Sequence, residues 1–365
     1  MSVIAIICDT HFGVRSDAPA VYHHMQKFYE RVFFPTLKAH GVTRLLHGGD
    51  YCDRRKFINF ATSRFIEDHY RTPLRELNII EDVIIGNHDC FLRDSTDINS
   101  VAELYRHDPT VRFYTQPIEI DVDGCRILLL PWICGNNRDA TMKMIATSTA
   151  QVVLGHLEIS GFQMYRGMPS HEGLDPALFD RFSLVMSGHY HHRSSTHPIQ
   201  YLGAPYPMVW SDYSDPRGFH LFDTETHALT FVPNPYTMFA RLVYDDLDKP
   251  NTWITDMVNT IVASDSPYHD AYVKVVVKNK TQAFWFELIM DALAKVNALD
   301  VMIVDDVQSN DSEGNELPTT DIDTLTLMQE YVEGLSISCD KTELKSYLNR
   351  LYHDVVTASQ SARLS

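Results

Sequence analysis

The chain has 365 residues, of which 44% are hydrophobic and 22% are charged. The length suggests two or three domains of about 150 residues each. The composition is that of an ordinary globular protein, without an apolar run of the roughly 20 residues that a membrane span needs. The formal net charge of −17 excludes a strongly basic binder of polyanions, so any grip on nucleic acid depends on local basic patches, metal ions or a partner.

The first residues and the cysteines indicate the compartment. The chain runs from Met1 directly into an apolar strand pattern, without a basic segment followed by a small-residue cleavage site, so we expect a cytoplasmic protein. The six cysteines form no CxxC pair, and we expect them to be reduced thiols.

From residue 1 to about 205, apolar strand patterns alternate with helical patterns, which is typical of an α/β domain. Residues 20–39 and 60–77 carry apolar side chains at helical spacing, and Pro73 predicts a kink or a break in the second segment. A hairpin is predicted at 218–232. Five short aliphatic runs predict strands that are buried on both faces, at 3–7, 45–46, 83–85, 152–154 and 184–186.

The pattern changes after Asn234 and Pro235. Strands at 240–244, 272–278 and 301–306 alternate with helices at 252–263 and 281–297, which predicts a smaller α/β domain. An acidic linker with few apolar residues follows, and then two short amphipathic helical patterns, which either dock on the body of the protein or bind another protein. The predicted division is 1–235, 236–308, a linker at 309–320 and a helical segment at 321–365.

Side chains that bind metals or transfer protons follow each of the five buried strands. Ligands at the ends of such strands converge on one edge of a sheet. One motif of this kind is weak evidence, but all five in this order predict a phosphoesterase that uses two metal ions. The motifs are Asp9-Thr10-His11, Gly49-Asp50-Tyr51-Cys52-Asp53, Gly86-Asn87-His88-Asp89, Gly155-His156 and Gly188-His189-Tyr190-His191.

The chemistry of phosphodiester hydrolysis explains these residue types. The negative oxygens of the ester repel hydroxide, and two cations about 3.5 to 4 Å apart neutralise that charge and activate water. Asp50 is the natural carboxylate to bridge both ions, and Asp9 and His11 can hold one ion together because they point to the same side of an extended chain. The mixed nitrogen and oxygen set suits manganese, iron or zinc better than calcium. The other predicted ligands are Asn87, His156, His189 and His191.

Four further residues lie beside these ligands in the sequence. His88 is the candidate proton donor, or the positive charge on the transition state, and Asp89 is expected to orient it. Asp53 either orients a ligand or begins the next loop. Arg54 either meets a phosphate or is solvated.

Together these residues resemble the calcineurin-like metallophosphoesterase superfamily, and within it the SbcD-type DNA repair nucleases, which include the recombination endonuclease subunits of T-even bacteriophages. The form Asp-x-His-x-Gly favours the nucleases over the protein phosphatases. One departure is Asp53 with Arg54, where many of these nucleases have histidine. The resemblance is carried by residues 9–13, 129–132, 155–158, 188–191 and 215–219, besides the metal motifs.

The resemblance implies a four-layer β-sandwich flanked by helices, a capping domain that selects DNA, a homodimer formed by the two early helices, and a C-terminal helical segment that binds a coiled-coil ATPase of the SbcC type. It implies an exonuclease and single-strand endonuclease for DNA recombination and repair, located in the host cytoplasm if a phage encodes it. A phosphatase or small-molecule phosphodiesterase is the alternative, and a scaffold with a decayed site is a third reading. The implied manganese ligands are Asp9, His11, Asp50 and His191 for one ion, and Asp50, Asn87, His156 and His189 for the other.

Overall fold

The computed structural model describes residues 2–165, 168–170 and 172–305, and residues 341, 344–345 and 347–348 near the C-terminus. The chain divides into one unit of residues 1–307 and a second of residues 308–365. The predicted linker, most of the predicted helical tail and the end of the strand predicted at 301–306 lie outside the described residues. In the part of the chain that is described, no helix is both long and apolar enough to cross a membrane.

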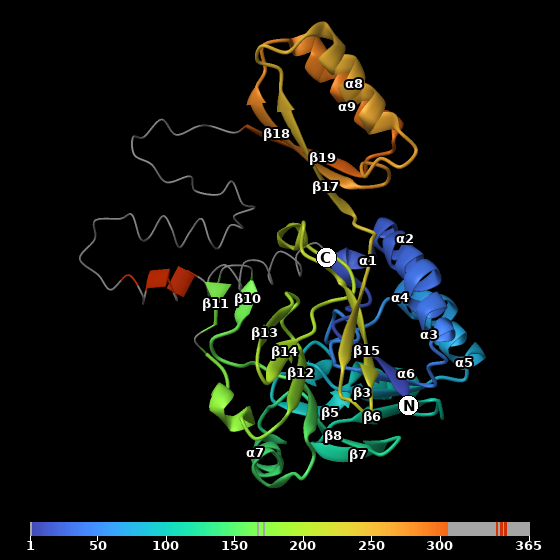
Figure 1. Cartoon of the computed structure of the whole chain (residues 1–365), viewed down its shortest axis with the longest axis vertical. Coiled ribbons are helices and arrows are strands. Elements are labelled where there is room, and N and C mark those ends of the chain that lie inside the picture. Colours follow the sequence, from blue (N-terminus) through green and yellow to red (C-terminus); the bar gives the residue numbers. More distant parts are fainter. Residues whose placement is uncertain are drawn as a thin grey trace. The chain divides into compact units, whose positions relative to one another are not determined.

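A mixed sheet of six strands forms one half of the core (Figure 1). Its strands are β1 (Val3–Ile7), β2 (Arg44–His47), β3 (Ile80–Ile84), β6 (Val111–Tyr114), β15 (Gly218–Asp223) and β16 (Leu229–Pro233). The order is β16-β15-β1-β2-β3-β6, in which β1, β2, β3 and β6 are parallel. The predicted hairpin is β15 and β16, which pair antiparallel and close this sheet against β1.

A second six-stranded sheet packs on the first. Its strands are β7 (Ile118–Val122), β8 (Cys125–Leu130), β9 (Val152–His156), β12 (Leu184–Gly188), β13 (Ser194–Thr196) and β14 (Ile199–Tyr201), in the order β13-β14-β12-β9-β8-β7. The four middle strands are parallel. Ile4 and Ile6 of the first sheet share one buried cluster with Leu129, Leu154 and Met186 of the second. The predicted α/β class is therefore confirmed, with helices on the outer faces of two packed mixed sheets.

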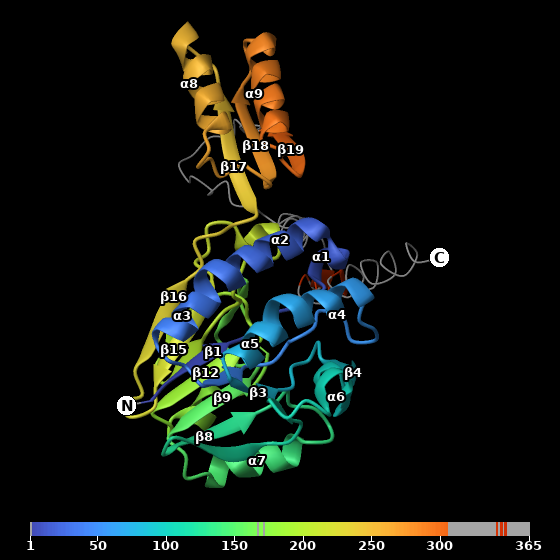
Figure 2. The ribbon, with the colours of Figure 1, turned by 90° about the vertical axis from the view of Figure 1, so that its right-hand side faces the viewer.

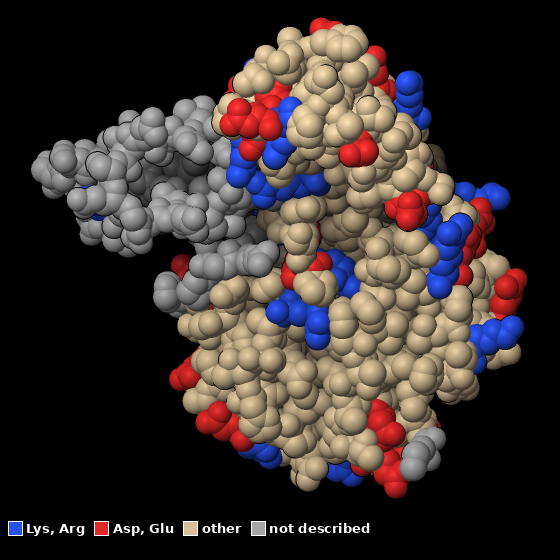
Figure 3. Space-filling view, turned by 45° about the horizontal axis from the view of Figure 1, so that its top comes forward, with Lys and Arg blue, Asp and Glu red and all other residues tan. Residues whose placement is uncertain are grey.

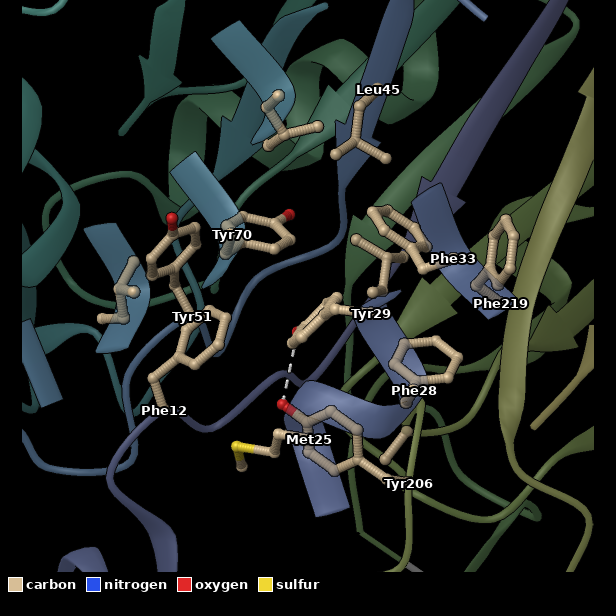
Figure 4. Packing of buried hydrophobic residues seen from close by; sticks show 14 of the residues in the cluster. Phe12, Met25, Phe28, Tyr29, Phe33, Leu45, Tyr51, Tyr70, Tyr206 and Phe219 are labelled. Atoms are coloured by element: carbon tan, nitrogen blue, oxygen red, sulfur yellow. Dashed lines mark hydrogen bonds between the residues drawn. The ribbon is translucent and has the colours of Figure 1, made fainter. Parts of the chain in front are cut away.

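Helices α2 (Pro19–Phe28), α3 (Phe34–Ala39), α4 (Phe60–Ile66) and α5 (Thr72–Glu76) cover the outer face of the first sheet, as Figure 2 shows from the side. Their aromatic side chains fill the space above the sheet (Figure 4), where the hydroxyls of Tyr29 and Tyr206 lie 3.4 Å apart. Helix α7 (Arg138–Thr147) packs on the outer face of the second sheet through Ile145. Short elements complete the core: α1 (Val14–Asp17), β4 (Cys90–Leu92), β5 (Ser95–Asn99), α6 (Ser100–Tyr105), β10 (Gln163–Tyr165), β11 (Met168–Pro169) and 3₁₀ turns at Pro176–Phe179 and Trp210–Asp212.

Both early helical segments pass through a proline without ending. A π-helical turn precedes each proline, at Tyr29–Phe33 before Pro35 and at Glu67–Arg71 before Pro73. The N–H of Thr72 bonds to the carbonyl of Glu67, five residues earlier, and this wider turn gives the proline ring room. Of the kink or break predicted at Pro73, the break is wrong, because the wider turn accommodates the proline ring.

The region after residue 235 has its own apolar core. Strands β17 (Phe239–Asp245), β18 (Tyr272–Asn279) and β19 (Asp300–Asp305) form a parallel sheet, and α8 (Asn251–Val262) and α9 (Ala283–Lys295) connect them. Leu242, Val275 and Leu293 belong to a buried cluster of this region. The predicted order of strand, helix, strand, helix, strand is confirmed, with bounds within two residues of the predicted ones.

Candidate metal centre

The five sequence motifs come together where β1, β2, β3, β9 and β12 end. Asp9 follows β1, Asp50 follows β2 and Asn87 follows β3, while His156 is the last residue of β9 and His189 follows β12. Ligand atoms of Asp9, His11 and His191 all lie within 4.8 Å of one another, and so do those of Asp50, His156 and His189. The structure thus brings all seven predicted ligands together: six of them form these two groups, and Asn87 lies beside the second group through its own contacts.

Four of these residues have a left-handed backbone conformation. The φ angles are 54° at Asp9, 40° at His11, 53° at Asp50 and 86° at His189. Such a conformation costs about 1 to 3 kcal/mol for a non-glycine residue and persists only where the surroundings fix it. Backbone bonds provide the constraint, because the N–H of Asp9 donates to the carbonyl of Gly49 at 3.0 Å and that of His11 to Asp50 at 3.0 Å.

In the first group, two imidazole nitrogens face one another. His11 Nε2 lies 3.0 Å from His191 Nε2, and Asp9 Oδ2 is buried without a hydrogen-bond partner. Two nitrogen lone pairs at this distance repel unless a proton or a cation lies between them. The unpartnered carboxylate oxygen beside them makes a cation the better fit.

In the second group, His156 and His189 both point at the side-chain oxygen of Asn87. His156 Nε2 lies 2.9 Å and His189 Nδ1 3.0 Å from Asn87 Oδ1. The other ring nitrogen of His156 lies 2.8 Å from the carbonyl of Gly48, which can only accept, so Nδ1 carries a hydrogen and Nε2 is the nitrogen left for a metal ion.

Asp50 joins the two groups. Its Oδ2 lies 3.5 Å from His11 Nε2 and 3.4 Å from His156 Nε2. Its Oδ1 accepts a hydrogen bond of 2.8 Å from the backbone N–H of His88. One carboxylate between two sets of nitrogen and oxygen donors fits a pair of divalent cations, and the imidazoles favour manganese, iron or zinc over calcium.

Burial and charge shift the acidities in opposite directions. Burial alone would lower the pKa of His11, but the Asp53 and Asp50 carboxylates outweigh it and raise the pKa to about 9. The pKa of His156 is also raised to about 9, because Asp50 outweighs burial there. Burial lowers the pKa of His189 to about 3 and raises that of Asp9 to about 6. Without metal, the centre therefore holds protons on two of its ligands at neutral pH.

His88 lies outside both ligand groups. Its Nδ1 lies 2.7 Å from the backbone carbonyl of Asp53 and therefore carries a hydrogen, which leaves Nε2 for a substrate. The side chain lines a cleft of about 190 Å³ together with Asp50 and His189. The Asp53 carboxylate lies 3.3 Å from His11 Nδ1, so Asp53 supports a ligand as well as His88.

The expectation that Asp89 orients His88 is wrong. The buried Asp89 carboxylate instead accepts hydrogen bonds from the backbone N–H groups of Gly86 and Tyr51, each 3.0 Å long, and from the hydroxyl of Ser100 at 2.8 Å. Asp89 and its neighbour His88 point in different directions in this tight turn. Because Asp89 accepts from both Gly86 and Tyr51, it connects the two ligand loops. Arg54 is 2.6 Å from Asp17, so that carboxylate already engages it.

Arg217 has a role that sequence reasoning missed. It is buried and lies 2.7 Å from Asp212 and 2.9 Å from Asp215, and it also donates to the carbonyl of His191. Asp215 lies 2.9 Å from His192 as well. The family resemblance pointed to the segment 215–219, but no local pattern shows that an arginine 26 residues away holds a ligand loop.

Comparisons with known proteins agree with this site. The family described as Calcineurin-like phosphoesterase matches residues 2–193. Exonuclease subunit 1 of Enterobacteria phage T4 is 34% identical over 348 residues, which cover 94% of this chain and 96% of that protein. The SbcD subunit of the nuclease SbcCD of Staphylococcus saprophyticus is 23% identical over 192 residues, which cover 50% of this chain and 46% of that protein.

A solved structure of a novel archaeal phosphodiesterase aligns with a TM-score of 0.29 and 11% identity over 64% of this chain and 99% of that one, which is too low to bear on fold or function. The family match spans more than half of the chain, and the phage relative spans nearly all of it. The chain therefore belongs to the calcineurin-like phosphoesterase family, in the same group as the phage exonuclease subunit and the SbcD-type nucleases.

Proposed function

We propose that the protein is a manganese-dependent DNA nuclease that hydrolyses phosphodiester bonds from ends and within single strands, in DNA recombination and repair. The observation that carries this proposal is Asp50, one carboxylate between two groups of ligands. The name of the phage relative, exonuclease subunit 1, supports a nuclease over the alternative of a phosphatase or small-molecule phosphodiesterase.

We assign each site residue either to metal binding or to proton transfer. Asp9, His11, Asp50 and His191 would hold one ion, and Asp50, Asn87, His156 and His189 the other. When bound, the two ions supply positive charge for the phosphate oxygens and lower the pKa of a water molecule. His88 directs Nε2 into the cleft and, when protonated, gives its proton to the leaving oxygen as the bond from phosphorus to that oxygen breaks.

Charge on the surface supports a DNA substrate. On the face in Figure 3, Lys and Arg side chains form small local clusters, with Asp and Glu side chains beside several of them. A protein with a net charge of −17 needs such local clusters to attract a polyanion. We assign residues 236–308 to a capping domain that selects the DNA, which is supported by their separate apolar core.

Partners follow from the resemblance and from exposed apolar side chains. One relative is named as a subunit of the nuclease SbcCD, which supports an SbcC-type ATPase partner, bound through residues 321–365 after the linker at 309–320. Phe60 at the start of α4 is 93% exposed and Phe57 50%, and such a patch supports a homodimer through the early helices. The site of action would be the cytoplasm of the host cell.

The test is manganese-dependent release of nucleotides from end-labelled single- and double-stranded DNA, with an aryl phosphodiester as a second substrate. We expect both DNA substrates to be degraded, and His88→Ala to abolish this. Hydrolysis of the aryl ester with intact DNA, even after addition of an SbcC-type ATPase, would favour the small-molecule phosphodiesterase. Bound metal without activity on any substrate would favour a scaffold.

A further inference from the structure

A second cleft lies beside the metal centre and is not used by the chemistry described above. It has a volume of about 260 Å³, and His156 of the second ligand group is one of its lining residues. Through His156, which is fully buried, this cleft adjoins the second ligand group. Its other walls include Trp132, Ile133, Arg138, Glu158 and Leu174.

Trp132 is fixed as one wall of this cleft. Its backbone N–H donates to the carbonyl of Ile85 at 2.7 Å, and its own carbonyl accepts from the side chain of Asn137 at 2.8 Å. The centroid of its ring lies 5.2 Å from that of His189 and 6.2 Å from that of His156. The indole thus backs onto two proposed ligands and is only partly buried, which leaves surface for the cleft.

The opposite wall is held by backbone pairing. The N–H of Leu174 donates to the carbonyl of Glu158 at 2.8 Å, and the N–H of Ser160 donates to Leu174 at 3.0 Å. Gly173 has a φ of +106°, and a Cβ there would lie 2.5 Å from the Glu158 carbonyl. Because glycine alone fits this approach, the wall has a defined position, and the cleft exists before any ligand binds.

Charge at the mouth of the cleft is available for a ligand. Arg138 is the exposed first residue of α7, and no hydrogen bond or ion pair engages its guanidinium within the described residues. Glu158 supplies a carboxylate that can accept hydrogen bonds from amino groups. An aromatic face, a free cation and an acceptor around one small cleft match the parts of a nucleotide, namely a base, a phosphate and exocyclic amines.

We propose that this cleft holds the nucleoside next to the scissile phosphodiester, with its base against Trp132 and the following phosphate at Arg138. The proposal rests on the nuclease function proposed above, because it requires a phosphate at the neighbouring ligands. It gives the site a preference for an unpaired nucleotide, since a base inside a duplex cannot stack on a protein side chain. Base stacking of this kind depends little on sequence, which suits a nuclease without base preference.

The test measures binding separately from hydrolysis. In the presence of manganese, deoxyadenosine 5′-monophosphate and deoxyribose 5-phosphate are compared by quenching of tryptophan fluorescence and by calorimetry. We expect the nucleotide to bind about tenfold more tightly than the sugar phosphate, which is within the range for one base on one aromatic ring. Trp132→Phe should lose the fluorescence signal but keep most of the calorimetric preference, and Trp132→Ala should lose the preference.

A second variant keeps the test informative if Trp132→Ala disturbs the ligands behind it. Arg138→Ala changes an exposed side chain. We expect it to weaken the binding of a dinucleotide about tenfold more than the binding of a mononucleotide. Arg138→Lys should restore most of the lost affinity for the dinucleotide. Equal binding of the nucleotide and the sugar phosphate by the wild type would overturn the proposal. So would an undiminished base preference in Trp132→Ala.

Hydrolysis then separates the two proposals. The wild type should cut DNA with an abasic residue beside the labelled bond more slowly than intact DNA. Trp132→Ala should cut the two DNA substrates at the same rate. If DNA is cut and the abasic residue makes no difference, the nuclease function stands and the cleft proposal is wrong. If the nucleotide binds with the expected preference and no DNA is cut under any condition, the cleft binds a nucleotide and the nuclease function is wrong.

Discussion

The metal centre and the small sheet of β17, β18 and β19 are built in opposite ways. In the metal centre, Asp9, His11, Asp50 and His189 stand on left-handed backbone that side chains usually avoid, and buried polar groups face one another. In the small sheet, side chains alternate regularly, with Leu242 buried and Val243 42% exposed, and no residue of these three strands has a positive φ.

The difference shows where each region obtains its stability. The small sheet follows its own periodicity and covers one face with α8 and α9. The ligand loops gain nothing from local preference and depend on bonds between loops, such as those that Asp89 accepts from Gly86 and Tyr51. Substitutions in the first region should therefore change chemistry and metal binding, whereas substitutions in the second should change stability.

The largest effect is expected from Asp50→Asn. It removes the charge that both ligand groups share, so both ions should be lost and hydrolysis of DNA should fall by at least about a thousandfold. Metal content by mass spectrometry and hydrolysis rates check this result. Asp180→Asn, an exposed change of the same kind, is the control and should behave as wild type. Retention of two ions by Asp50→Asn would contradict the bridging role.

His88→Gln should separate chemistry from metal binding. His88 is absent from the groups that contain Asp50 and His191, although its ring lies within 4.8 Å of ligand atoms of His11 and Asp53. We therefore expect the metal content to stay while the turnover number falls by at least about a hundredfold, as for loss of a general acid. The same two measurements apply. A fall in metal content in step with the rate would show that His88 is a ligand.

Metal affinity should rise with pH. The raised pKa values of about 9 at His11 and His156 mean that both are protonated in the metal-free protein at neutral pH, and a metal ion must displace these protons. Affinity for each ion should increase about tenfold per pH unit between pH 7 and 9 and level off above that. Calorimetry in buffers of different ionisation enthalpy counts the released protons. A release of none at pH 7.5 would rule out this coupling.

Asp89→Asn should lower the affinity for the metal ions without removing a ligand. An amide keeps the shape of the carboxylate but meets the N–H groups of Gly86, Tyr51 and Cys52 with one donor in place of an acceptor. We expect metal affinity to fall by about ten- to a hundredfold, as for other residues behind ligands. Manganese titrations measure this change, and saturating manganese should restore most of the rate. A rate that does not recover would instead indicate a role in the chemistry.

The smallest effect is expected where the two regions meet. The guanidinium of Arg15 lies 4.5 Å from the ring centroid of Tyr272 and 5.6 Å from that of Phe239. Arg15→Ala should lower the free energy of unfolding by about 0.5 to 2 kcal/mol, the range for such contacts, and leave metal content unchanged. Urea unfolding compares it with Arg31→Ala, which is exposed. Loss of metal in Arg15→Ala would show that the small sheet supports the centre directly.

The sequence by itself determined the strands that carry the motifs, the order of the motifs and the seven candidate ligands. The strands are aliphatic runs, and ligands at the ends of parallel strands must converge, so both follow from periodicity and chain direction. The small sheet of β17, β18 and β19 could also be predicted, because the periodicity of its sequence matches the burial of its side chains in the structure.

Only the tertiary structure decided how the second layer of the site is arranged. Asp89 turned away from its neighbour His88, Asp53 supported His88 through a backbone carbonyl, and Arg217 reached the His191 loop across 26 residues. These contacts depend on left-handed turns and on loops from different strands, which no local spacing encodes. The π-helical turn before Pro73 was also not predicted, because helical spacing does not show whether a proline breaks a helix or is accommodated by a wider turn.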